Sequence, residues 1–252
     1  MSRFLRLPTR DPRTLARDIP GIPKILFPQL TSSFVASLNK RSIEISNINA
    51  VDDLLVKQSH LARSMLFEFA YAIAEQKINF MAEISIQECF EIAKYRQAKY
   101  YDFSPLSYDA ITDIDIEIAD IVAENLVSML SCYKQQLNTA VVIEPPIYGF
   151  EWISNSQGDF ALDSTLIEVK CINKNFAVAD YRQALIYWLL SYIKSLNSDV
   201  QEWTNIILMN PRLNKTVEVS VDHLLYEISG GQSKIEIVQM FSSIISEFYR
   251  HN

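Results

Sequence analysis

Cysteine, histidine and glycine are scarce in this chain of 252 residues, with three, three and five copies. Cys89, Cys132 and Cys171 lie far apart and the histidines are scattered, so we expect neither a disulfide framework nor a zinc site. The longest apolar run, 184–193, is about half the length of a membrane helix, and the first residues lack the apolar run of a signal peptide. These absences predict a protein of a reducing cytoplasm that makes no contact with a membrane.

Positive charge is also in short supply. The chain has 23 Lys and Arg against 30 Asp and Glu, and its net charge is -7. From residue 139 onward, eight basic residues face 13 acidic ones. Because contacts to phosphates supply most non-specific affinity for nucleic acids, a chain of this charge that acts on nucleic acid would bind it weakly by itself. We would then expect a partner that delivers the substrate.

The most informative segment runs from Gly158 to Cys171 and contains two acids and one amine. Asp159 precedes a short apolar strand, a turn follows at 163–165, and a second strand returns through Glu168 and Lys170. Residues two apart on a strand leave the same face. Glu168 and Lys170 should therefore share one face, with Asp159 near their level on the neighbouring strand.

These three residue types suit phosphate chemistry. Mg²⁺ prefers oxygen ligands, binds through one or two carboxylates, and keeps positions for waters and a phosphate oxygen. Asp159, Glu168 and the carbonyl of Val169 are the predicted ligands. Such an ion can act as a Lewis acid and help to generate hydroxide, while Lys170 would orient the attacking water and offset negative charge. The segment therefore predicts a metal site for phosphodiester cleavage.

A helical pattern follows, in which Gln183 and Tyr187 are four residues apart and share one face. The spacing Asp-x₈-Glu-x-Lys, then Gln-x₃-Tyr, resembles the PD-(D/E)XK nuclease superfamily, in particular its RecB-like branch. The resemblance covers roughly residues 139–210. It implies an α/β fold with a restriction-endonuclease-like mixed central sheet flanked by helices, here with a mostly helical N-terminal half.

The resemblance also implies a function. Asp159 and Glu168 would bind Mg²⁺, for which Mn²⁺ would substitute, Lys170 would serve the attacking water, and Gln183 and Tyr187 would support the site or contact DNA. The expected activity is a DNA endonuclease, the nuclease subunit of a restriction or anti-phage system beside an ATPase or helicase, with a homo-oligomer as a further option. The alternative is a binding subunit that keeps the fold and cuts nothing.

Two features leave the family pattern or complicate it. Gly158 stands where the family name has Pro, and the acid that many members present before the sheet has four open candidates, Glu117, Glu124, Glu144 and Glu151. A second Glu-x-Lys triplet, 75–77, lies in a helical pattern with no Asp hairpin before it. We interpret this second triplet as a solvated helix face.

The chain divides into a basic, proline-containing arm at 1–48, a helical region at 49–110 and the nuclease-like region at 111–252. The arm could touch DNA or a partner, or lie as an ordinary terminus on an acidic surface. Lys174 and Arg182 could reach phosphates or be plain surface charges, and the aromatic group Tyr95, Tyr100, Tyr101 and Phe103 could stack bases or end a buried helix. The expected strands are 140–143, 150–154, 160–162, 166–171, 205–209 and 217–221, and the expected later helices are 113–130, 178–196 and 234–249.

Overall fold

The computed structural model describes residues 10–17, 21–80, 85–98 and 110–251, which form an α/β fold. The described strands make two sheets, a mixed one of five strands and a ribbon of two. The helices are α1 (Pro12–Arg17), α2 (Gly21–Leu26), α3 (Ser32–Asn39), α4 (Asp53–Val56), α5 (Arg63–Phe80), α6 (Ile86–Ala98), α7 (Asp113–Leu137), α8 (Val178–Ser195), α9 (Val221–Ile228) and α10 (Lys234–His251). The strands are β1 (Val141–Ile143), β2 (Pro146–Ile147), β3 (Ser156–Gln157), β4 (Phe160–Leu162), β5 (Thr165–Val169), β6 (Asn205–Asn210) and β7 (Lys215–Ser220).

The five-stranded sheet has the order β1-β4-β5-β6-β7. Strands β5 and β6 are parallel, and helix α8 provides the crossover between them, as a parallel connection requires. The other pairs are antiparallel. A two-residue turn at Asp163 and Ser164 joins β4 to β5, and Asp163 adopts the left-handed φ of 48° that aspartate tolerates.

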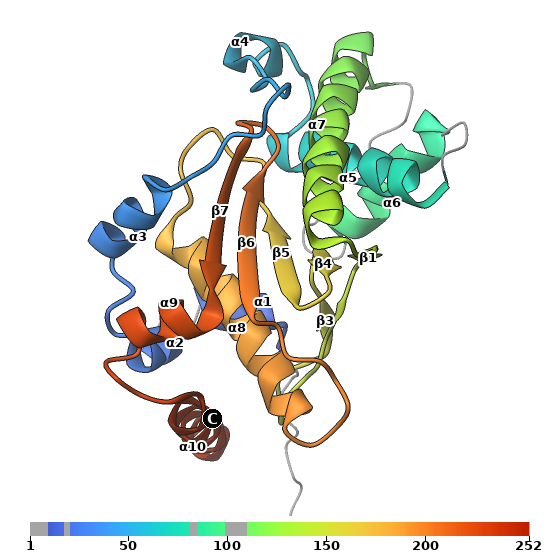
Figure 1. Ribbon diagram of the computed structural model, residues 1–252. Coiled ribbons are helices and arrows are strands. Elements are labelled where there is room, and N and C mark those ends of the chain that lie inside the picture. Colours follow the sequence, from blue (N-terminus) through green and yellow to red (C-terminus); the bar gives the residue numbers. More distant parts are fainter. Residues whose placement is uncertain (1–9, 18–20, 81–84, 99–109, 252) are drawn as a thin grey trace, which may run out of the picture.

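Apolar side chains of the sheet alternate between two cores, one on each face. Leu166, Ile206 and Leu208 pack with α8 and the N- and C-terminal helices, whereas Ile167 and Ile207 pack with α5, α6 and α7. Figure 1 shows the sheet between these two groups of helices. Because both faces are covered, the central strands are mostly apolar, and a buried polar side chain there, such as Glu168, needs a specific partner.

Most predicted elements form within two residues of their expected ends, including β1, β4, β5, β6, β7 and α8. The predicted strand at 150–154 is wrong. Phe150 and Ile153 instead pair with each other around a tight turn in which Glu151 has a φ of 51°. Trp152 and Ile153 are both buried although they are consecutive, which a flat strand with opposite-facing neighbours does not favour.

The basic N-terminal segment also differs from the extended arm of the sequence analysis. Its described part forms the short helices α1, α2 and α3, and Leu15, Ala16, Ile22 and Leu26 of the first two are buried in the core with α8. Among the described prolines, Pro12 and Pro23 stand in the first turns of α1 and α2, where the ring is tolerated, and Pro28 follows the end of α2. In the described part of the chain, no helix has the length and apolarity needed to span a bilayer.

Candidate functional site

The sheet register brings the two predicted acids together. Phe160 pairs with Ile167 in the antiparallel β4–β5 ladder, and the next pair in that register is Asp159 with Glu168. The carboxylate of Asp159 accepts a hydrogen bond from the backbone N–H of Val169, with Oδ2 and N 2.6 Å apart. Asp159 therefore lies against the backbone between Glu168 and Lys170.

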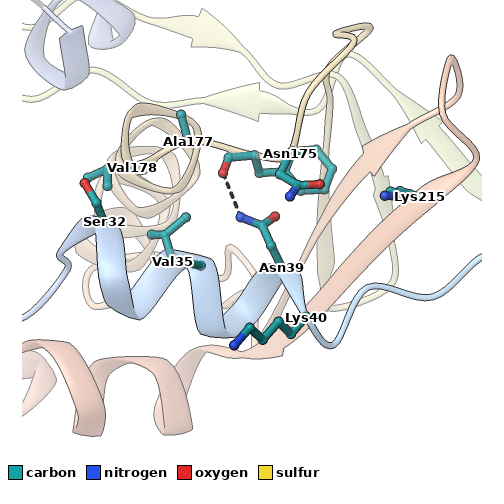
Figure 2. A pocket seen from close by; sticks show the side chains of 10 residues that line it. Ser32, Val35, Asn39, Lys40, Asn175, Ala177, Val178 and Lys215 are labelled. Carbon is teal, nitrogen blue, oxygen red and sulfur yellow. Dashed lines mark hydrogen bonds between the residues drawn. The ribbon is translucent and has the colours of Figure 1, made fainter.

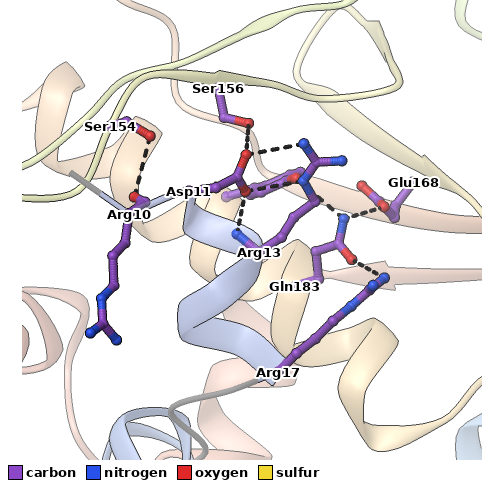
Figure 3. Close-up of polar contacts among 9 residues, drawn as sticks. Arg10, Asp11, Arg13, Arg17, Ser154, Ser156, Glu168 and Gln183 are labelled. Carbon is purple, nitrogen blue, oxygen red and sulfur yellow. Dashed lines mark hydrogen bonds and ion pairs between the residues drawn. The ribbon is translucent and has the colours of Figure 1, made fainter. Parts of the chain in front are cut away.

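Four predicted residues form one hydrogen-bonded network on the α8 side of the sheet. Lys170 Nζ lies 2.6 Å from Glu168 Oε1 and donates to Gln183 Oε1 at 3.1 Å. Gln183 Nε2 donates to Glu168 Oε1 at 2.6 Å and to the hydroxyl of Tyr187 at 3.2 Å. Figure 3 shows the Gln183 amide between Glu168 and Arg17 of α1. The amide thus fixes Glu168 and Lys170 relative to helix α8.

The pKa values of Asp159 and Lys170 are shifted by burial and by the neighbouring charges. Burial raises the pKa of Asp159 to about 8, with Glu168 adding to the rise, and the cation of Lys170 opposes it. For Lys170, burial works to lower the pKa, but the charges of Glu168 and Asp159 outweigh it and raise the pKa. Lys170 is therefore an ammonium at neutral pH. It can orient a water or neutralise negative charge, and it is not a base.

The donor set fits a hard divalent cation. Glu168 Oε2 is buried and has no hydrogen-bond partner among the described residues, which is costly for a carboxylate oxygen. Asp159 supplies a second carboxylate beside it. In the described ranges, no cluster of three or more His, Cys, Asp and Glu side chains could hold a metal ion. Two carboxylates match the one or two that Mg²⁺ uses when waters complete its shell.

A further acid near the pair is Glu68 of α5, which the sequence analysis did not single out. Its charge contributes to the raised pKa of Asp159, and burial raises the pKa of Glu68 itself. Glu68 and Glu75 are seven residues apart, and this spacing places both on one face of a helix. This spacing of two acids within an apolar helical pattern was the sequence signal that could have pointed to Glu68.

The four acids considered from sequence have other partners or surroundings. Glu117 is exposed, Glu124 pairs with Lys77, and Glu151 accepts a hydrogen bond from Ser246. Glu144 pairs with Arg96, with Oε1 and Nη2 3.0 Å apart, although its backbone N–H donates to the carbonyl of Asp159. None of these four carboxylates is bonded to Asp159 or Glu168 within the described residues.

The interpretation of the second triplet as a solvated helix face is wrong for Glu75. This side chain is 5% exposed and pairs with Arg96 at 2.7 Å. Burial raises the pKa of Glu75 to about 7 against the opposing effect of Arg96. Lys77 leaves another side of the helix, where it pairs with Asp120 at 2.7 Å and with Glu124.

The remaining sequence candidates stand apart from the network. Lys174 is exposed, and Arg182 is partly buried with its Nε unpaired among the described residues. Tyr95 is exposed, whereas Tyr100, Tyr101 and Phe103 lie outside the described residues. Cys171 is no thiolate nucleophile, because burial raises the pKa of its thiol to about 12.

A pocket of about 470 Å³ lies elsewhere, between α3, the loop before α8 and β7 (Figure 2). Val35 and Phe176 contribute apolar walls, Lys40 and Lys215 lie at its rim, and Asn39 donates to the carbonyl of Phe176 at 2.8 Å. It contains neither Asp159 nor Glu168. This pocket and the candidate chemistry therefore lie in different places, and we locate the site by its chemistry.

Comparisons of the chain with protein-family models, with curated proteins and with solved structures found no match.

Proposed function

We propose that this protein is a Mg²⁺-dependent nuclease that hydrolyses DNA phosphodiester bonds, with a restriction-endonuclease-like fold of the PD-(D/E)XK type. One observation carries the proposal: a buried Glu168 has one oxygen bound by Lys170 and Gln183, and its other oxygen has no partner among the described residues. Asp159 stands opposite it in the sheet register. A purely structural ion pair has no need for a second buried carboxylate at this place.

Each residue has a role that its surroundings support. Asp159 and Glu168 would hold Mg²⁺, which when bound supplies Lewis acidity and lowers the pKa of a water. An ammonium has three N–H donors, and Lys170 directs two of them to Glu168 and Gln183. The third can donate to the attacking water or to a phosphate oxygen. Gln183, supported by Tyr187, keeps Glu168 and Lys170 in register with α8.

The setting in a restriction or anti-phage system is also part of this proposal. It is supported by the resemblance of the motif and by the net charge of -7, which favours delivery of DNA by a partner such as an ATPase or helicase. Copurification of the protein with its partner, followed by cleavage assays with and without ATP, would test the setting.

Plasmid nicking tests the activity. Wild-type protein should nick supercoiled plasmid in Mg²⁺ or Mn²⁺ and not in EDTA, and Lys170→Ala should lower the rate on the order of 10²-fold. Lys77→Ala is the matched control, because it removes the lysine of the other Glu-x-Lys triplet, which pairs away from the site. Equal nicking by wild type and Lys170→Ala would contradict the proposal.

A further inference from the structure

Helix α1 packs against α8, the helix that carries Gln183 of the candidate site. Leu15 and Ala16 are buried against α8 in one core cluster. Just before the helix, the backbone N–H of Arg10 donates to the carbonyl of Trp152 at 3.1 Å, and the carbonyl of Arg10 accepts from Ser154 at 3.0 Å. Side chains of α1 are therefore presented from a fixed backbone.

Two arginines of α1 differ in their partners. Arg13 forms a two-pronged ion pair with Asp11, in which Nε and Nη2 each lie 3.0 Å from a carboxylate oxygen. Burial alone would raise the pKa of Asp11, but the hydrogen bonds and charge of Arg13 outweigh it and lower the pKa. The charge of Arg13 is therefore largely balanced by Asp11 (Figure 3).

Arg17 is instead hydrogen-bonded to the network itself. Its side chain reaches from the end of α1 to Gln183, and Nη2 donates to Oε1 at 3.2 Å (Figure 3). The same oxygen accepts from Lys170 at 3.1 Å, so two cations meet at one amide. Arg17 is an exposed residue, and in the described part of the chain no carboxylate pairs with it. A guanidinium has five N–H donors, so further donors remain for a ligand.

We propose that Arg17 is a substrate-binding residue whose guanidinium holds a phosphate of the nucleic-acid backbone next to the bond that is cut. This inference rests on the nuclease function proposed above. The carboxylate of Glu168 repels a phosphodiester anion, and Lys170 is already bound to that carboxylate. Arg17 offers an accessible cation one amide away, with the planar donor geometry that matches phosphate oxygens.

Duplex binding in EDTA tests this assignment without cleavage. The variants are Arg17→Gln, Arg17→Lys and the control Lys24→Gln, which removes one charge from an exposed residue of the neighbouring helix α2. Glutamine keeps an N–H donor for Gln183 and loses the charge, so it separates phosphate binding from support of the amide. Thermal unfolding of each variant confirms an intact fold.

At low salt, Arg17→Gln should weaken binding of a fluorescent duplex about tenfold, and the slope of log affinity against log salt should fall by about one. Arg17→Lys should recover part of the affinity, and Lys24→Gln should match the wild type. In Mg²⁺ assays, Arg17→Gln should raise KM with little change in kcat. These results together would support a phosphate contact.

Other outcomes would contradict the phosphate contact of Arg17. Wild-type affinity in Arg17→Gln, an equal loss in Lys24→Gln, no measurable duplex binding by the wild type, or a fall in kcat at unchanged KM would each reject the phosphate contact. The nuclease function fails separately, when Lys170→Ala nicks as fast as the wild type. A protein with the expected Lys170→Ala loss and normal binding by Arg17→Gln would keep the nuclease and lose only this assignment.

Discussion

The chain contains the triplet Glu-x-Lys in two settings, and the two behave differently. On strand β5, Glu168 and Lys170 leave the same face, and their charged atoms are 2.6 Å apart. On helix α5, residues two apart are separated by about 200° around the axis, and Glu75 and Lys77 do not meet. Glu75 pairs with Arg96, and Lys77 pairs with Asp120. The secondary structure therefore decides whether this pattern can build a common site.

The two carboxylates also differ in how their charge is balanced. Glu75 faces Arg96, which is shared with Glu68 and Glu144. This guanidinium joins helices α5 and α6 to the end of β1, which is a structural task. Glu168 faces the compact ammonium of Lys170 and an amide, and a second acid stands opposite. Glu75 Oε1 and Glu168 Oε2 are both buried without a partner among the described residues. The strand triplet differs in having its own ammonium bound to the acid and a second acid opposite in the register.

The largest expected difference between the two centres is in cleavage. Glu168→Gln removes a proposed metal ligand and should lower Mg²⁺-dependent nicking on the order of 10²-fold or more. Glu75→Gln leaves the strand triplet intact and should stay within about twofold of wild type. Initial rates of plasmid nicking at saturating Mg²⁺ would measure both. Equal losses of nicking rate in Glu168→Gln and Glu75→Gln would contradict a catalytic role for the strand triplet alone.

A smaller difference is expected in the pH dependence of stability. The pKa of Glu75 is about 7 in the folded protein against 4.5 for an ordinary glutamate. The folded state thus holds a proton that the unfolded state has lost between these values, and the free energy of unfolding falls as pH rises from 4.5 through 7. Glu75→Gln removes this titration. Between pH 5 and pH 8, the variant should lose about 2 kcal/mol less stability than the wild type.

Urea unfolding at both pH values would measure this difference. Glu124→Gln serves as the control, because Glu124 is an exposed carboxylate that pairs with Lys77 and not with Arg96. The charges that face Glu75 are Arg96, Glu68 and Glu144. An identical pH dependence in wild type and Glu75→Gln would contradict the assignment of a buried, protonatable carboxylate at this position.

The smallest effect should come from Tyr187→Phe. Its hydroxyl accepts a hydrogen bond from Gln183, and Gln183 in turn donates to Glu168, so Tyr187 does not touch the proposed reacting groups. Loss of this buried acceptor should cost about 1 kcal/mol of unfolding free energy and reduce the nicking rate by roughly fivefold, because Gln183 loses one of its supports. Tyr226→Phe, at an exposed position, should change neither quantity. Unchanged stability and rate in Tyr187→Phe would remove this residue from the network.

Sequence patterns predicted those parts of the fold that are determined by residues close together in the chain. The turn predicted at 163–165, the strand period through Glu168 and the helix with Gln183 and Tyr187 follow from nearby residues. The structure has a turn at 163–164, with Thr165 already in β5, and brings the site residues together. The roles assigned to them remain predictions. The interpretation failed where tertiary packing decides, as at 150–154, where two consecutive apolar residues are both buried in a tight turn.

Sequence patterns also did not predict contacts between segments that are far apart in the chain. Arg17 and Gln183 are separated by 166 positions along the chain, and Arg17 lies in a segment whose prolines suggested an extended arm. The seven-residue spacing of Glu68 and Glu75 placed both on one helix face, but it did not reveal that both are at least partly buried beside Arg96. Burial of α1 on α8 and of α5 on the opposite face depends on the assembled core, which periodicity alone does not specify.

The most direct test of the central claim is a crystal structure of the protein with Mn²⁺, in which anomalous scattering locates the ion. The account predicts one ion bound by the carboxylates of Asp159 and Glu168, with Lys170 beside it. An ion at the Arg96 centre or elsewhere, or Asp159 and Glu168 too far apart to share one ion, would contradict it.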